Sequence, residues 1–243
     1  FQLMERIFNE CQDPSVRKQL AFLLARQLIV FEDIEDDEIL EIATNIRLYS
    51  RFEEVSKRLQ KSKPKTPDDV LQLQATLGNR QNSRGEKALS LIAKSFVAGF
   101  HNAGIKQDHY YTAPRGDDCI LRNRPSGKAV AVASLAMLHL WDVETGLNEL
   151  DKYTKSDDPS IQMGALTGVG IVSSAIRSEF DPAKAILSDY INHEDMDVKV
   201  GAIFGFAMAY AGSARQDILE IFDQLLQHTD IRVRAYSTLA IGL

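Results

Sequence analysis

One six-residue phrase occurs twice in this chain, and its repetition limits the possible folds more than any other feature. Met-Gly-Ala-Leu-Thr-Gly at 163–168 returns 37 residues later as Val-Gly-Ala-Ile-Phe-Gly at 200–205. A related apolar stretch follows the polar turn at Asp230, and a weaker copy begins at Lys128. Repeats of this length with two helical patterns in each are typical of α-solenoids, in which helical hairpins stack on their neighbours. The predicted fold class is therefore all-α, an α-solenoid of helical hairpins.

Composition and charge narrow the classes of partner. Of the 243 residues, 44% are hydrophobic and 26% are charged, values that are ordinary for a folded domain. The net charge of −6 argues against general binding to nucleic acid or to an anionic membrane, since no excess of cations is available to displace phosphate counterions. We therefore expect no nucleic acid and no membrane among the partners, and a partner chosen by charge should be basic.

The apolar segments and the two chain ends also carry information. The longest apolar runs, 129–141, 163–176 and 200–212, are shorter than the roughly 20 residues that span a bilayer, so they are predicted to be buried helices. Cys11 and Cys119 are too few for a disulfide scaffold or a zinc motif, which fits a reducing compartment. The chain begins without Met and stops inside an apolar helix, where a solenoid normally carries polar capping repeats. We expect an internal fragment of a longer chain.

Three segments are predicted along the chain, with N-terminal helical hairpins at 1–65 and the repeats at 128–243. Between them, 66–127 should hold helices and an irregular insertion at 104–127 that is either a small β-hairpin, with strands near Tyr110–Thr112 and Cys119–Leu121, or a partly disordered loop. Helix starts are indicated where an acceptor side chain precedes proline, because such a pair caps the first N–H groups and fixes φ. These pairs are Asp13-Pro14, Thr66-Pro67, Asp158-Pro159 and Asp181-Pro182.

The two helices of each repeat differ in pattern. The stretch 198–210 is apolar on all sides, which predicts an inner helix packed between neighbours. The stretch 216–227 is apolar on one side only and acidic on the other, which predicts an outer helix with a solvated face. Gly164 and Gly168, like Gly201 and Gly205, lie four apart on the inner helices, where a missing side chain permits close backbone approach.

The chain offers no arrangement typical of catalysis or metal binding. The five histidines are far apart in sequence, and none has a ligand spacing with another His or Cys. Gly168-Val169-Gly170 lies within a helical repeat and lacks the strand context of a nucleotide-binding loop. The acidic runs at 35–38, 157–158 and 194–197 precede helices, where negative charge complements the helix dipole. We expect no enzyme activity and no cofactor.

Several phrases resemble the proteasome/cyclosome repeats of the scaffold subunits in the base of the 26S proteasome, specifically the family of regulatory-particle non-ATPase subunit 2. The resemblance covers nearly the whole chain. It rests on the phrases at 140–147, 150–153, 164–172, 181–183, 187–191 and 209–213, with 16–22, 67–70 and 95–100 resembling the region before the repeats. The Gly-Ala-Leu phrases also suit the paralogous subunit 1, and a generic helical-repeat adaptor or transport factor that binds a peptide on its concave face remains a further alternative.

The family resemblance implies a strongly curved or closed toroid without catalysis, in the cytoplasm and the nucleus. It implies docking to proteasomal ATPase subunits, to ubiquitin, to ubiquitin-like domains of shuttle factors and to a ubiquitin-specific deubiquitinase. Because such receptors use acidic and apolar residues on toroid helices, the candidate contacts are Asp189, Asp217, Glu220, Asp223 and Asp230. The segment that follows, with Arg232 and Arg234, is more basic than the family's acidic receptor helix.

Overall fold

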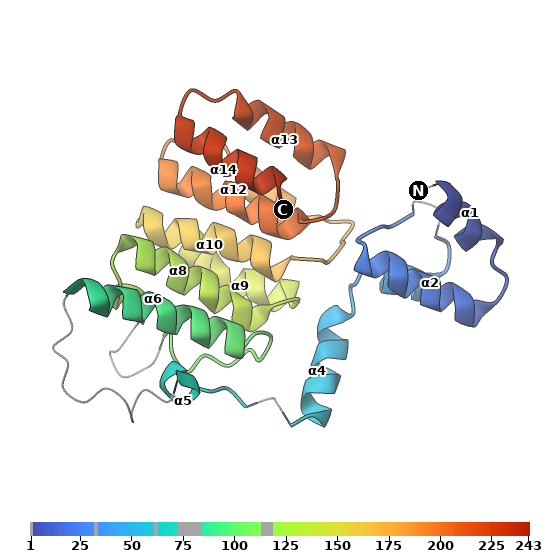
Figure 1. Cartoon of the computed structure of the whole chain (residues 1–243), viewed down its shortest axis with the longest axis horizontal. Coiled ribbons are helices and arrows are strands. Elements are labelled where there is room, and N and C mark those ends of the chain that lie inside the picture. Colours follow the sequence, from blue (N-terminus) through green and yellow to red (C-terminus); the bar gives the residue numbers. More distant parts are fainter. Residues whose placement is uncertain (1, 32–33, 61–62, 72–83, 113–118) are drawn as a thin grey trace.

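The computed structural model describes residues 2–31, 34–60, 63–71, 84–112 and 119–243. The described residues form helices and connecting turns, with no strand among them, which confirms the all-α class. The N-terminal helices are α1 (Gln2–Glu10), α2 (Pro14–Arg26), α3 (Asp37–Ala43), α4 (Leu48–Arg58) and α5 (Pro67–Leu71). The remaining helices belong to a repeat stack, which Figure 1 shows beside α1 and α2.

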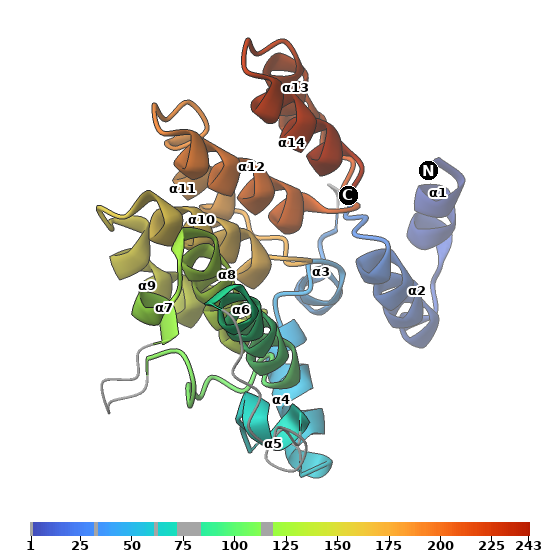
Figure 2. The ribbon, with the colours of Figure 1, turned by 60° about the vertical axis from the view of Figure 1, so that its left-hand side comes forward.

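The repeat stack has two layers of helices. The inner layer runs in order through α6 (Arg84–His101), α8 (Pro125–Ala136), α10 (Pro159–Val172), α12 (Met196–Tyr210) and α14 (Ile231–Ile241). The outer layer contains α9 (Val143–Thr154), α11 (Pro182–Ser188) and α13 (Gln216–Leu226), and Figure 2 shows α9 and α11 on one side of the inner helices. Each outer helix follows the inner helix of its own hairpin, so the periodic sequence does fold as stacked hairpins.

Glycines set the spacing within the inner layer. A Cβ atom added at Gly201 on α12 would lie 2.7 Å from the Cα and the carbonyl oxygen of Met163 on α10. A Cβ atom at Gly205 would lie 2.5 Å from the carbonyl oxygen of Leu166, and one at Gly164 would collide with the backbone of Ala129 on α8. Since backbone atoms cannot rotate away, these positions exclude any side chain, and the neighbouring helices are in backbone contact.

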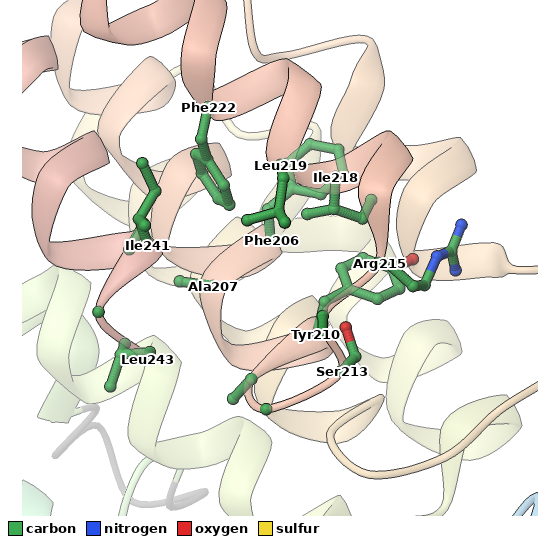
Figure 3. Close-up of a pocket in the computed structure, with 15 residues that line it drawn as sticks. Phe206, Ala207, Tyr210, Ser213, Arg215, Ile218, Leu219, Phe222, Ile241 and Leu243 are labelled. Carbon is green, nitrogen blue, oxygen red and sulfur yellow. The ribbon is translucent and has the colours of Figure 1, made fainter. Parts of the chain in front are cut away.

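The last inner helix is spaced differently from the others. Arg234 and Thr238 stand where the two preceding inner helices carry glycines, and α14 contacts α12 over a smaller surface than α10 does. The ring of Tyr236 packs edge-on against Phe204 between the two helices, with 5.3 Å between ring centroids. An apolar pocket of about 350 Å³ opens between α12, α13 and α14, and Figure 3 shows Phe206, Leu219 and Phe222 directed into it.

The inner helices are not fully sandwiched, contrary to the prediction for 198–210. Most of α12 is buried, but Phe204 and Met208 are only half-buried. They line an apolar groove of about 440 Å³ that continues across Met163 on α10, Met137 after α8 and Phe100 on α6. Because the outer helices cover only one side of the inner layer, the opposite side keeps an apolar surface.

Three of the four predicted proline-led helix starts have the expected cap. Asp13 accepts hydrogen bonds from the N–H groups of Ser15 and Val16, Asp158 accepts one from Ser160, and the Thr66 hydroxyl accepts one from Asp69. At Asp181 the helix start is confirmed, since α11 begins at Pro182, but the predicted cap is wrong: the Asp181 side chain makes no capping bond to α11, and its backbone is left-handed with φ of 41°. Its carboxylate instead accepts hydrogen bonds from Tyr210 and Arg215, which lie on the next repeat.

The β-hairpin considered for 104–127 is also wrong for its described parts, while its tip lies outside the described residues. Cys119–Arg122 forms the short helix α7 instead of a strand. The carboxylate of Asp108 accepts hydrogen bonds from the backbone N–H groups of Tyr110, Tyr111 and Thr112, at 2.8, 2.7 and 2.7 Å. One side chain therefore accepts hydrogen bonds from three successive backbone N–H groups and folds this segment into a turn. These N–H groups are then not available for hydrogen bonds to a neighbouring strand.

The N-terminal helices have a hydrophobic core of their own and meet the repeat stack along a seam, through polar contacts and through the rings of Phe52 and Trp141. Phe8, Leu24 and Ile39 belong to this separate core. At the seam, the side-chain amide of Asn45 donates hydrogen bonds to the carbonyl oxygens of Ala25 and Ala175, at 3.2 and 2.9 Å. One amide thus joins the N-terminal helices to the turn after α10.

Candidate binding surface on the outer helices

The outer helix α13 has the one-sided character that its sequence predicts. Ile218, Phe222 and Leu225 are buried against the stack. Glu220 and Asp223 are exposed on the opposite side. Positions three apart share one face of a helix, so these two carboxylates are presented together on a firmly packed element.

Asp217 belongs to an ion-pair network rather than to this open surface. Its carboxylate accepts hydrogen bonds from the guanidinium of Arg215 at 2.5 and 3.0 Å and from Lys184 Nζ on α11 at 2.7 Å. The hydrogen bond from Arg215 is the main cause that holds the pKa of Asp217 well below its ordinary value of 3.8. Because Arg215 also binds Asp181, this network joins the start of α13 to the start of α11.

Replacing Asp217 with asparagine should lower the free energy of unfolding in a pH-dependent way. The folded-state pKa is depressed, so the contribution is present above the unfolded-state pKa near 4 and is lost as pH falls through the folded-state value. The side chain is 40% exposed, so the loss at pH 7 should be at most about 1 kcal/mol. Denaturant melts of wild type and variant at pH 7 and pH 3 measure it, and the difference should shrink at pH 3. Asp223→Asn is the control, and equal effects from both variants would contradict the network.

Asp230 is likewise engaged within the fold. It is the N-cap of α14, where its carboxylate accepts a hydrogen bond from the backbone N–H of Arg232 at 2.7 Å and pairs with the Arg232 guanidinium at 3.1 Å. Its own N–H donates to Nδ1 of His228 at 3.0 Å. The bond from Arg232 is the main cause of a lowered pKa at Asp230. The arginine that makes this segment basic therefore neutralises the neighbouring acid.

The five predicted contacts thus separate into two groups. Asp217 and Asp230 have cationic partners within the chain, whereas Asp189, Glu220 and Asp223 are exposed and have no ion pair or hydrogen bond from their carboxylates to other described residues. Asp189 lies at the end of α11, apart from the pair on α13. Sequence reasoning missed Ile231, which is 70% exposed at the first position of α14, directly after the Asp230 cap. No signal in the sequence indicated this exposure, because the equivalent positions of the two preceding repeats, Ile161 and Val198, are buried.

Three of the five histidines, His139, His193 and His228, are half-buried or hydrogen-bonded within the fold. His193 and His228 each accept a hydrogen bond at Nδ1 from the N–H of the aspartate two residues later, at 3.0 Å in both cases. Burial lowers the pKa of His139. No group of three His, Cys, Asp or Glu side chains within the described ranges is placed to hold a metal ion. None of the helices that the structure describes is long and apolar enough to cross a membrane.

Known proteins resemble this chain over most of its length. Residues 1–74 match the family model described as the RPN1 N-terminal domain. The 26S proteasome non-ATPase regulatory subunit 2 of Dictyostelium discoideum is 34% identical over 226 residues, which are 93% of this chain and 25% of that protein. The 26S proteasome regulatory subunit rpn-1 of Neurospora crassa is 33% identical over 252 residues, covering 99% of this chain and 28% of that protein. Subunit 2 homolog B of Arabidopsis thaliana is 35% identical over 202 residues, covering 77% and 23%.

The matches cover both parts of the chain, the N-terminal helices and the repeat stack. The family model covers the N-terminal helices, and the Dictyostelium and Neurospora relatives extend the similarity through the repeat stack. The chain spans about a quarter of the length of these two relatives. Together with the stacked hairpins, the matches show that the chain is similar, over most of its own length, to part of the 26S proteasome non-ATPase regulatory subunit 2.

Proposed function

We propose that this chain is a non-catalytic scaffold segment of the proteasome regulatory particle that docks ubiquitin or a ubiquitin-like domain on its outer helices. The observation that supports docking is the pair Glu220 and Asp223, two exposed carboxylates on a packed helix that have no partner in the part of the chain that the structure describes. The exposed Ile231 on the next helix adds an apolar contact. A partner face that is both basic and apolar complements such a surface.

The wider set of partners is part of the same proposal. The relatives are named as subunits of the 26S proteasome, which supports neighbouring ATPase subunits as partners of this chain. Shuttle factors and a ubiquitin-specific deubiquitinase would use the same outer surface through their ubiquitin-like domains. A cytoplasmic and nuclear location is proposed together with a place in that assembly. The division into N-terminal helical hairpins at 1–65, helices with an irregular insertion that lead into the toroid at 66–127, and repeats at 128–243 is proposed with it.

A titration tests the docking proposal. Isotope-labelled ubiquitin is followed by nuclear magnetic resonance while the unlabelled 243-residue chain is added. The expected result is a set of shifted or broadened signals confined to one basic and apolar face of ubiquitin. Unchanged spectra at high concentration, with the chain shown to be folded by circular dichroism, would reject the receptor role and leave the scaffold role standing.

A second candidate function is favoured by the apolar groove across α6, α8, α10 and α12. Its walls include Phe96, Phe100, Val130, Met163 and Phe204, an apolar surface that suits a peptide with hydrophobic side chains. A helical-repeat adaptor would use this surface to carry such a peptide. Proteins that co-purify with the chain from cell extract distinguish the two functions, because an adaptor's partners would lack the proteasomal ATPases.

A further inference from the structure

A cleft separate from the outer helices lies between the N-terminal helices and the repeat stack. Its volume is about 720 Å³. One wall is the end of α2 with the segment that follows it, and the other is the turn between α12 and α13. The lining residues are Gln27, Leu28, Ile29, Val30, Arg177, Gly212, Ser213, Ala214 and Arg215.

The charge of this cleft is opposite to that of the chain. Its charged lining residues are Arg177 and Arg215, and no acidic side chain is among the described residues that line it. Gln27 and Ser213 add an amide and a hydroxyl, both of which can donate hydrogen bonds. A chain of net charge −6 therefore presents a local site that consists of cations and neutral donors.

Among the described residues, Arg177 is the cation of this cleft that has no carboxylate partner. Its backbone N–H donates to the carbonyl oxygen of Thr44 at 2.9 Å, which fixes the residue at the seam. Its guanidinium makes one long hydrogen bond, to the carbonyl oxygen of Leu28 at 3.4 Å, and no carboxylate of the described residues lies within ion-pair distance. Burial, and then the charge of Arg215, lower the pKa of Arg177. The half-buried guanidinium thus keeps donors that the fold does not satisfy.

The surrounding ion pairs do not compensate this charge. Asp181 and Asp217 both bind Arg215, and Asp217 also binds Lys184. Among the described residues, the three cations Arg177, Lys184 and Arg215 thus face two carboxylates, which leaves one positive charge more than negative in this group. An added carboxylate would complete the network.

We propose that this cleft binds an acidic, partly apolar peptide segment of a partner protein, whose carboxylate forms a bidentate pair with Arg177. A planar guanidinium matches a carboxylate in this geometry. The apolar wall at Leu28, Ile29 and Val30 accommodates an apolar residue next to the acid. The turn Gly212–Arg215 also borders the apolar pocket of Figure 3, which provides a second apolar surface nearby. The site is independent of the outer-helix docking surface.

Fluorescence anisotropy with two labelled peptides tests this site. One peptide carries a central Asp-Leu-Asp, and its match carries Asn-Leu-Asn in the same flanking sequence. The acidic peptide should bind the 243-residue chain at least about tenfold more tightly than its match, because only the carboxylates pair with Arg177. The preference should weaken as salt is raised.

Variants locate the binding. Arg177→Gln should reduce the affinity for the acidic peptide to that of the amide peptide. Gln27→Glu should also reduce the affinity for the acidic peptide, because it puts a carboxylate on the wall of the cleft at an exposed position. This variant removes no arginine, so it tests the proposal if Arg177→Gln does not fold. Lys155→Gln, at the exposed end of α9, is the matched control and should leave the affinity unchanged.

Three outcomes would overturn the proposal. In the first, the wild-type chain binds the acidic and the amide peptide with equal affinity. In the second, both cleft variants bind the acidic peptide as tightly as the wild-type chain does. In the third, the wild-type chain binds inorganic phosphate more tightly than the acidic peptide. The last would assign the cleft to phosphate rather than to a carboxylate. The ubiquitin titration described above does not depend on these variants, so failure of either proposal is recognised separately.

Discussion

Replacing Gly201 with leucine should lower the free energy of unfolding by about 1–3 kcal/mol or more, because the new side chain would overpack the inner layer. The first added carbon would already lie 2.7 Å from the Met163 backbone on α10. The two inner helices would have to separate, and every contact along α10 and α12 would weaken with them. Chemical denaturation followed by circular dichroism measures the change.

Gly242→Ala is the matched control for this prediction. Gly242 follows α14, its φ is −74°, and an added Cβ would meet the nearest atom at an ordinary 3.4 Å. We expect a change within about 0.5 kcal/mol, in line with surface substitutions that touch nothing critical. If both variants melted like wild type, the backbone contact between α10 and α12 would be disproved.

Replacing Leu187 with alanine should cost about 2–5 kcal/mol, the range for removing a buried leucine side chain. Leu187 is 0% exposed and anchors the outer helix α11 against the inner layer. Its Cδ2 atom would lie 2.7 Å from a Cβ at Gly205, so the leucine occupies the space that this glycine leaves empty. Alanine would leave a cavity between α11 and α12 that the rigid backbone cannot fill by collapse.

Leu239→Ala provides the comparison, since Leu239 is 60% exposed on α14 and undergoes the same chemical change. Its effect should stay within about 0.5 kcal/mol. Thermal or denaturant melts of the two variants then distinguish the effect of burial on stability from the effect of losing side-chain volume, which is the same in both. Similar losses at positions 187 and 239 would contradict the two-layer packing.

Periodicity predicted the layers of this fold because it records burial directly. The all-round apolar pattern of 198–210 and the one-sided pattern of 216–227 gave the inner and outer helices, and the paired glycines gave the places of closest approach. The remaining apolar groove was not foreseen, since a helix that is apolar all round gives no sign of which face lacks a neighbour. Phe204 and Met208 show this limit.

Local rules were less successful where tertiary contacts compete with them. Asp181 precedes proline like the other capping residues, yet Tyr210 and Arg215 from the next repeat bind its carboxylate. Asp108 draws three backbone donors into a turn, although the flanking residues favour strands. Partners of this kind lie on other elements or depend on exact backbone direction, which a single sequence does not reveal.

The candidate binding surface was predicted only as a group of acidic residues. Sequence placed Asp217 and Asp230 together with Glu220 and Asp223, but only the structure separates the paired carboxylates from the open ones. For Asp230, the nearby Arg232 gave a local sign of pairing. For Asp217, Lys184 comes from another helix, so spacing alone was insufficient.

The affinity for ubiquitin of a Glu220→Gln/Asp223→Asn variant tests the proposed docking surface most directly. Exposed ion pairs contribute about 0.2–1 kcal/mol each, so loss of two should weaken binding by a factor between about 2 and about 30. The matched control is Glu144→Gln, which neutralises an exposed acid on the outer helix α9 and should leave binding unchanged. Weaker binding in the double variant alone is the predicted result. Equal binding by wild type, control and double variant would contradict docking on α13.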